Sequence, residues 1–236
     1  MIATELVTLP ANGAERPFLN CRVAGPRGAP LLLFLHGFPE AAFVWDALLA
    51  HFGEHYRCVA PNLRGYPGSF APADVKAYRA HLVLSDLIAL IRQQAATPDT
   101  PAAAVIAHDW GGAVAWNLAN QQPQLMKRLA IINSPHPGAF VRELSHNAAQ
   151  QAGSQYMHFL CRPDAEALLA EDDFRRLFAF FNAPDGSAPA WLTDEVRAQY
   201  RALWQQGLQG ACNYYRASPI RPPREGDPGA QAITLP

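Results

Sequence analysis

Short, continuous apolar runs alternate with helical patterns in the first 133 residues, and this alternation constrains the fold more than any other feature. The runs are LLLFL (31–35), YRCVA (56–60), AAAVIA (102–107) and LAIIN (129–133). Helical patterns lie between them at 43–52, 79–95 and 112–121. Such runs are typical of strands buried on both faces, and their alternation with helices predicts an α/β fold with a mostly parallel sheet. Stretches 4–9 and 18–23 predict an antiparallel starting hairpin.

The pattern changes after Asn133, where strand-like runs stop and helical patterns follow one another. These patterns cover 139–150, 154–161, 164–171, 173–182 and 192–206. The last stretch, 218–236, carries five prolines and predicts a loop or linker. We therefore expect an α/β core over 1–133, a helical insertion over 134–217, and a linker over 218–236 that returns to the core.

Composition limits the class of protein. Half of the 236 residues are hydrophobic, 17% are charged, and the net charge is −1. These values are typical of a globular domain with a large core, and they argue against nucleic acid as the main partner. No apolar run approaches the ~20 residues that span a bilayer, so we expect no membrane partner.

The cysteines and the first residues bear on location. The four cysteines are scattered without a C-x-x-C pair, and the opening MIATELVTLP has no secretory segment. We therefore expect reduced thiols and a cytoplasmic protein. The eight histidines show no H-E-x-x-H spacing, and the loop NLRGYPGS (62–69) has no Walker lysine and no G-x-G-x-x-G pattern. We expect no metal and no cofactor.

The segment VIAHDWGGAVAW (105–116) places a carboxylate, Asp109, where a buried strand gives way to a helix. A strand followed by small-x-Asp-x-Gly and a helix has the pattern of a nucleophile elbow. The sharp turn exposes the central side chain, and the small neighbours Ala107 and Gly111 let strand and helix pass closely. Taken alone, the same segment also fits an aspartate that merely caps the helix.

A second motif, LFLHGFPE (33–40), follows another buried strand. Gly37 permits a tight turn that directs the next backbone N–H into a site. Alone, it also fits an ordinary turn. Together with the elbow, it resembles the α/β-hydrolase arrangement, in which this N–H and the one after the nucleophile form the oxyanion hole. The resemblance assigns those roles to Phe38 and Trp110.

Within that superfamily the chain resembles the epoxide hydrolases. The motifs that carry the resemblance are HGFPE, NLRGYPGS, AHDWGGAVAW, INSPHPGAF, SQYMHFL and GACNYYRAS, which together extend over most of 31–218. The resemblance implies a helical cap that carries two tyrosine proton donors. Tyr156 and Tyr215 stand at the matching positions, and Tyr214 is the alternative to Tyr215. Each tyrosine also fits an ordinary half-buried cap residue.

These residues suit the chemistry that the resemblance implies. A carboxylate, with a reference pKa of about 4, is ionised near neutral pH and needs no base to act as a nucleophile. Attack by Asp109 on an epoxide carbon would leave an alkyl–enzyme ester. Because the leaving group is an alkoxide, a proton donor must sit at the ring oxygen, which is the role expected of Tyr156 and Tyr215.

Aromatic residues predict the character of the pocket. We expect His36 to orient the oxyanion turn and to line the substrate pocket together with Phe38 and Trp110. His108 is expected to pack beneath the elbow. An apolar pocket of this kind predicts a small apolar epoxide as substrate. The sequence leaves the oligomeric state open, a dimer included.

The acid and histidine that the superfamily places after the cap have no match here. No histidine follows His158, Asn133 occupies the alternative acid position, and Glu225 and Asp227 precede the expected next strand. We therefore expect a chain that ends before its final strands, through truncation or an incomplete sequence. A variant that binds without turnover is the third reading.

Other functions remain open from the sequence. Haloalkane dehalogenases resemble the chain at Asp109 and Trp110, but typically carry Asn where this chain has Phe38. Fluoroacetate dehalogenases carry Arg at the position of Trp110. An esterase would have serine in place of Asp109. A hydrolase-like protein that only binds its ligand is the alternative from another class.

Overall fold

The computed structural model describes residues 1–11, 13 and 15–223, and it contains a six-stranded sheet with the order β1-β2-β4-β3-β5-β6. The strands are β1 (Ala3–Thr8), β2 (Phe18–Ala24), β3 (Leu31–Leu35), β4 (Arg57–Pro61), β5 (Ala104–His108) and β6 (Leu129–Ile132). β1 and β2 form the expected antiparallel hairpin, and β2 pairs antiparallel with β4. The other neighbours are parallel, so the predicted fold class is confirmed.

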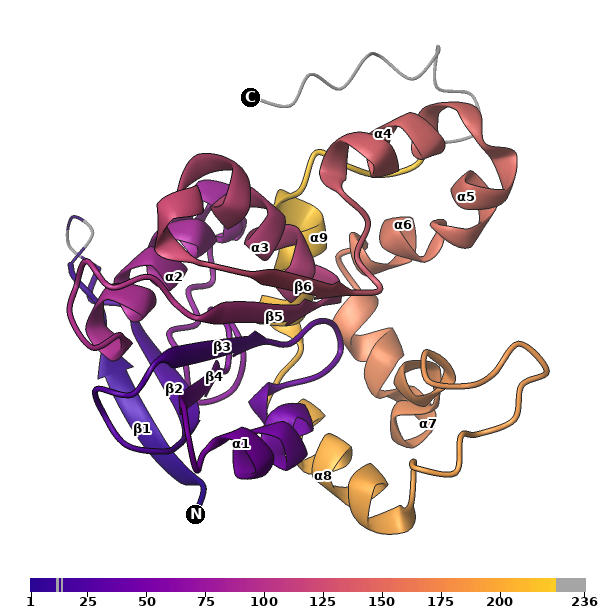
Figure 1. Ribbon diagram of the computed structural model, residues 1–236. Helices are drawn as coiled ribbons and strands as arrows, with labels where there is room; N and C mark the ends of the chain where they lie inside the picture. Colours follow the sequence, from indigo (N-terminus) through magenta and orange to yellow (C-terminus); the bar gives the residue numbers. More distant parts are fainter. Residues whose placement is uncertain (12, 14, 224–236) are drawn as a thin grey trace.

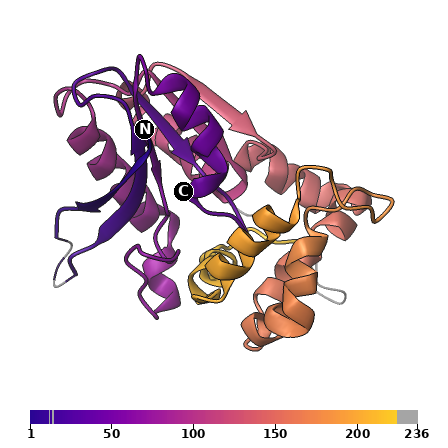
Figure 2. The ribbon, with the colours of Figure 1, turned by 90° about the horizontal axis from the view of Figure 1, so that it is seen from below.

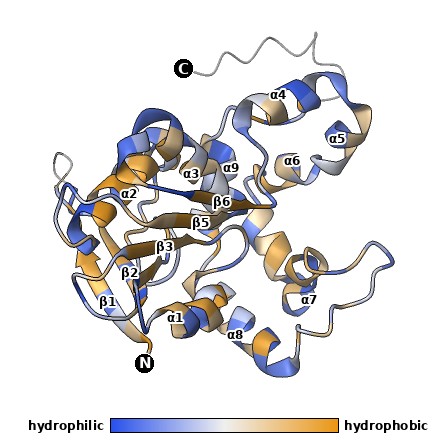
Figure 3. Ribbon diagram, in the orientation of Figure 1, coloured by the Kyte–Doolittle hydropathy of each residue, from blue (hydrophilic) through white to orange (hydrophobic). Residues whose placement is uncertain are grey.

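The central strand β3 is buried on both faces because all five of its residues are apolar (Figure 3). Successive side chains of a strand point to opposite faces, so Leu31, Leu33 and Leu35 belong to one core cluster. Leu32 and Phe34 belong to another. A continuous apolar run therefore fits this position, whereas an alternating one would expose polar groups to the core.

Helices cover both faces of the sheet (Figure 1). One face packs against α2 (Ala80–Gln94) and α3 (Asp109–Gln121), and the other against η1 (Ala42–Trp45) and α1 (Asp46–Phe52). The short turns η2 (Val75–Tyr78) and η3 (Pro123–Leu125) complete this part of the chain. The helix predicted at 112–121 begins three residues earlier, at Asp109.

The helices after β6 group together on the side of the sheet away from the β1–β2 hairpin (Figure 2). They are α4 (Pro137–His146), α5 (Ala148–Gly153), α6 (Tyr156–Leu160), α7 (Ala165–Ala179), α8 (Asp194–Trp204) and α9 (Gln209–Ala217). The backbone leaves helical geometry at Glu171–Phe174, which divides α7 close to the predicted 164–171 and 173–182. α9 is absent from the predicted helices. The division at residue 134 stays a prediction, and 224–236 of the predicted linker lie outside the described residues.

Hydrogen bonds attach α8 and α9, the last two helices, to loops of the core. The Trp204 indole N–H of α8 donates to the Pro39 carbonyl at 2.7 Å, and the Tyr214 hydroxyl of α9 donates to the Arg64 carbonyl at 2.9 Å. Gly65 and Gly210 touch at the start of α9. A Cβ on Gly210 would lie 1.9 Å from the Gly65 carbonyl oxygen, so the contact requires glycine.

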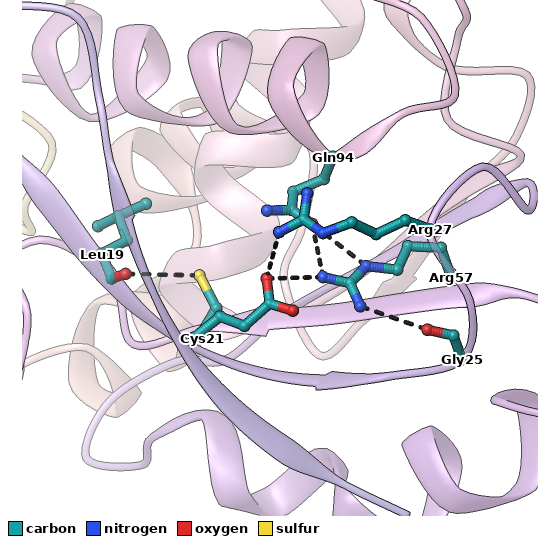
Figure 4. A network of polar contacts seen from close by, with 7 residues as sticks. Leu19, Cys21, Gly25, Arg27, Arg57 and Gln94 are labelled. Atoms are coloured by element: carbon teal, nitrogen blue, oxygen red, sulfur yellow. Dashed lines mark hydrogen bonds and ion pairs between the residues drawn. The ribbon is translucent and has the colours of Figure 1, made fainter.

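A polar network around the buried Arg57 side chain connects the sheet to α2. The Arg57 guanidinium, whose side chain is 4% exposed, donates to Gln94 Oε1 at 2.9 Å, Glu5 Oε2 at 2.8 Å and the Gly25 carbonyl at 3.3 Å (Figure 4). Arg27 adds a second cation to Glu5 at 2.7 Å. The network joins β1, β4 and α2.

In the described part of the chain, no helix is long and apolar enough to cross a membrane.

A second buried ion pair joins the loop after β4 to α2. Arg64 Nε and Nη2 each donate to the Asp86 carboxylate at 2.7 Å, and Arg64 Nη1 donates to the Ala77 carbonyl at 3.1 Å. The two side chains are 1% and 4% exposed. Loss of one partner would leave a buried charge without compensation, which is more costly than loss of the pair.

We therefore predict that Asp86→Asn lowers the free energy of unfolding by about 3–5 kcal/mol in urea titrations. Asp46→Asn is the matched control, because Asp46 pairs with Arg22 at the surface, where side chains are 34% and 37% exposed. Such a pair contributes about 0–1 kcal/mol. Equal losses in the two variants would contradict this account.

Candidate active site

Asp109 lies at a strained turn between β5 and α3. Its φ is +48°, a left-handed conformation that costs a non-glycine residue free energy and occurs where the surrounding structure enforces it. The glycines behind it are required by close packing. A Cβ on Gly111 would lie 2.6 Å from the His36 carbonyl oxygen, and one on Gly112 would lie 2.5 Å from Ser134 Cβ. The geometry is that of a nucleophile elbow.

The loop after β3 meets the carboxylate of Asp109. The Phe38 N–H donates to Asp109 Oδ1 at 2.8 Å, and the Gly111 N–H donates to the His36 carbonyl at 3.1 Å. The backbone N–H of Trp110 also lowers the pKa of the Asp109 carboxyl group. The two backbone donors assigned to the oxyanion hole, Phe38 and Trp110, thus converge on the predicted nucleophile.

The environment of Asp109 shifts its titration. Burial raises the pKa of Asp109 above its usual value, while the Phe38 and Trp110 N–H groups and the nearby His108 ring oppose that rise. Desolvation disfavours the charged carboxylate, and hydrogen bonds to it favour the charge. A poorly solvated carboxylate with two fixed donors is suited to nucleophilic attack.

Both predicted tyrosines reach this site. The ring of Tyr215, on α9, lies 5.3 Å from that of Phe38, 5.2 Å from that of Trp110 and 6.0 Å from that of Tyr156, on α6. Tyr156 is 37% exposed, but partial desolvation of its phenol and the charge of Asp109 raise its pKa to about 12, and the neighbouring Tyr215 lowers that pKa by a smaller amount. Burial raises the pKa of Tyr215 well above its usual value. Both phenols therefore keep their protons at neutral pH.

The adjacent residues Tyr214 and Tyr215 make different contacts. Tyr214 is 2% exposed and its hydroxyl donates to the Arg64 carbonyl at 2.9 Å. Its hydrogen bond is thus used to hold α9 against the core. Tyr215 lines the cavity that also contains Asp109, as does Tyr156.

The cavity has a volume of about 280 Å³ and lies between the carboxyl ends of β5 and β6 and the helices α4 to α6. Its walls are mainly apolar, with Trp110, Phe140 and Met157 among the lining side chains. Polar groups line it too, from Asn133, Ser134, Gln150, Ser154 and Ser218. Asn133 has a φ of +51°, so the end of β6 is a second strained position at the cavity.

His36 does not line this cavity, contrary to the expectation from sequence. It is fully buried: its Nε2 accepts from the Leu63 N–H at 3.0 Å, and its Nδ1 lies 3.0 Å from the Gly37 carbonyl. These bonds join the loops after β3 and β4, so His36 orients the turn from behind. Phe38 is 7% exposed and is also absent from the lining; its ring packs against Tyr215 and Phe180.

His108 belongs to a polar network that no sequence motif predicts. His108 Nδ1 lies 2.9 Å from Glu40 Oε2, and the Tyr200 hydroxyl of α8 donates to Glu40 Oε1 at 3.1 Å. The hydrogen bond to Glu40 raises the pKa of His108. Glu40 was part of the quoted HGFPE motif, but its partner is 68 residues away in the chain. Only the fold places them together.

The histidines of the helices after β6 lie away from the cavity. His136 Nδ1 accepts from the Gly138 N–H at 3.2 Å and caps α4, and neither His136 nor His158 lines the cavity. Glu225 and Asp227 lie outside the described residues. In the ranges 1–11 and 15–223, no three His, Cys, Asp or Glu side chains are grouped as metal ligands.

Comparison with known proteins identifies the family. A family model described as the alpha/beta hydrolase fold matches residues 30–210. The AB hydrolase superfamily protein YfhM of Bacillus subtilis is 36% identical over 203 residues, which cover 84% of this chain and 69% of YfhM. The chain therefore belongs to the α/β-hydrolase superfamily.

Within the superfamily, the chain is similar to epoxide hydrolases. Mouse epoxide hydrolase 4 is 34% identical over 82% of this chain, and the match covers 54% of the mouse protein. A solved structure described as novel epoxide hydrolases of the alpha/beta hydrolase superfamily from metagenomes of hot environments has a TM-score of 0.82 and 34% identity. That match covers 100% of this chain and 77% of the solved chain. These relatives place the chain in the epoxide hydrolase family. The chain spans about half the length of the curated epoxide hydrolase 4.

We predict that Gly37→Ala destabilises the protein, since the new Cβ would lie 2.3 Å from Asp109 Cβ and 2.6 Å from Asp109 Oδ1. Overpacking of about 1–3 kcal/mol corresponds to a fall in Tm of about 2–12 °C. Gly138→Ala, at the first turn of α4, meets only ordinary contacts and should leave Tm unchanged or slightly higher. A Gly37→Ala variant that melts with the parent would show that the loop and the elbow are not in contact.

Proposed function

We propose that this chain opens epoxides by attack of Asp109 and that the complete reaction yields a vicinal diol. One observation supports the proposal above others. Asp109 sits at the strained elbow, accepts the Phe38 N–H at 2.8 Å, and lines one cavity together with Tyr156 and Tyr215. The residues that we assign as nucleophile and proton donors therefore line one mainly apolar pocket, which supports the proposal.

The first step needs a nucleophile and an acid. An Asp109 carboxylate oxygen forms a bond to an epoxide carbon, and the bond from that carbon to the ring oxygen breaks. The ring oxygen takes a proton from Tyr156 or Tyr215, and the product is a hydroxyalkyl ester of Asp109. The raised pKa of each tyrosine keeps the proton in place until the alkoxide forms.

The second step hydrolyses the ester. Water adds to the Asp109 carbonyl carbon, the tetrahedral oxyanion forms, and expulsion of the diol oxygen regenerates the carboxyl group. We assign stabilisation of the oxyanion to the Phe38 and Trp110 N–H groups. Activation of the water requires a base, and the described lining of the cavity contains no histidine. We therefore expect this 236-residue polypeptide to accumulate the ester.

The cavity also favours a neutral substrate. Its described lining includes one carboxyl group, Asp109, and no lysine, arginine or histidine. An anionic group bound there would face that carboxylate without a counterion, which is unfavourable in a poorly solvated space. Trp110, Phe140 and Met157 provide apolar contact, so we propose a small uncharged epoxide with an apolar substituent.

Incubation of the 236-residue protein with excess styrene oxide should give a lasting mass increase of one epoxide. The modified peptide should contain Asp109. Asp109→Asn replaces the carboxylate with a neutral amide, a weak nucleophile, and should give no adduct. Intact-mass spectrometry with peptide mapping measures both, and circular dichroism confirms that the variant is folded.

Two outcomes would contradict this expectation. Sustained diol formation without an adduct would show that a base acts on the ester in this polypeptide. An unmodified, folded parent protein would remove Asp109 as the nucleophile and favour a protein that only binds its ligand.

The tyrosine pair gives a second test. Tyr215→Phe and Tyr156→Phe should each slow adduct formation, and the double variant should lose most of the ~10²–10⁴-fold that a general acid contributes. Tyr214→Phe is the control, because its hydroxyl holds the Arg64 carbonyl and not the cavity. It should lower stability without a matching loss of rate. A double Phe variant that reacts at the parental rate would remove both tyrosines from the mechanism.

A further inference from the structure

Two of the polar side chains that line the cavity and have no part in the proposed ring opening lie one helical turn apart. Gln150 is on α5, and Ser154 is the residue that ends this helix. Ser154 is only 2% exposed, although it lines the cavity. Gln150 Nε2 donates to Ser154 Oγ at 2.9 Å, so the two side chains form a pair one helical turn apart.

The backbone holds this pair in place. Asn147 Oδ1 caps α5 by accepting from the Ala149 and Gln150 N–H groups at 3.0 and 3.2 Å. At the other end, the Ser154 N–H donates to the Gln150 carbonyl at 3.0 Å. Both side chains therefore project from a fixed turn, which is the condition for a selective contact with a ligand.

The hydrogen bond inside the pair leaves a donor unused. A serine hydroxyl has one proton to donate and two lone pairs. Ser154 Oγ accepts from Gln150, and among residues 1–11 and 15–223 no acceptor takes its proton. Buried hydroxyls are normally satisfied by protein, water or ligand. The Ser154 proton therefore requires an acceptor from within the cavity.

The chemistry of that acceptor is limited by the walls around it. The cavity lacks a described cation, so a carboxylate or phosphate group is unfavourable near Asp109. An uncharged oxygen that accepts a hydrogen bond matches the Ser154 proton without this penalty. An ether oxygen is the simplest such group, since it accepts and does not donate.

We propose that Gln150 and Ser154 form a polar subsite that binds an uncharged ether or carbonyl oxygen of the substrate. This subsite would select epoxides that carry such an oxygen, glycidyl ethers for example, over hydrocarbon epoxides of the same shape. The inference rests on the proposed function, because it names the substrates of the same cavity. Gln150 keeps the Ser154 hydroxyl oriented, and Ser154 makes the contact.

Two ligands of equal length test the subsite. Phenyl glycidyl ether and 4-phenyl-1,2-epoxybutane differ only by an oxygen in place of a methylene. Affinity is measured by calorimetry in the Asp109→Asn background, where no ester forms. The ether should bind about three- to tenfold more tightly, the ratio that one net hydrogen bond gives. Adding Ser154→Ala should bring that ratio close to one, and adding Gln150→Leu should reduce it.

Gln155→Leu is the matched control, because Gln155 is an exposed glutamine beside the pair whose amide donates to the Gln151 carbonyl. It should keep the full preference for the ether. Melting curves of each variant confirm the fold. Equal affinity of the two ligands in the Asp109→Asn background would overturn the subsite, as would a preference that survives both Ser154→Ala and Gln150→Leu.

The design separates this inference from the proposed function. A parent protein that forms no adduct with either epoxide, while the preference in binding depends on Ser154, would refute the reaction and support the subsite. Adduct formation at Asp109 without any preference in binding would support the reaction and refute the subsite.

Discussion

The hydrogen bond from the Phe38 N–H to Asp109 Oδ1 joins the two loops on which the rest of the site depends. It requires that the turns after β3 and β5 lie in contact, and only glycine at position 37 leaves room for the Asp109 side chain. The parallel register of β3 with β5 brings both turns to one edge of the sheet. Strain at Asp109 is thus sustained by the packing of two buried strands.

The chemistry that we propose at this edge also needs the helices that follow β6. α8 is attached to the HGFPE loop through Trp204 and Tyr200, and α9 is attached to the loop after β4 through Tyr214. The loops around the turn at Asp109 therefore also position the helices that lie above that turn. One hydrophobic cluster runs from α2 and α3 into α6 to α9 without interruption.

Local sequence was sufficient to predict those elements in which a residue type has a single structural role. Continuous apolar runs predicted the buried strands, and the small residues around Asp109 predicted the turn. The rest depends on contacts between distant segments. α9 is short, follows Gly207 and has Gly210 as its second residue, which disfavours the prediction of a helix there. His36 faces away from the cavity, where its Nε2 accepts from the N–H of Leu63, 27 residues further along the chain. The contact between Glu40 and His108, and the cavity position of Gln150 and Ser154, likewise follow from packing that no local pattern encodes.

The contact between Gly65 and Gly210 gives α9 a different role from the helices that precede it. It fixes α9, and with it Tyr215, to the core, whereas α4 and α5 form another part of the cavity wall. Substitutions in α4 and α5 can therefore change the shape of the cavity without displacing Tyr215. The helix that carries one proposed acid is thus anchored separately from the helices that shape the far wall, so recognition can change while the position of that acid stays the same.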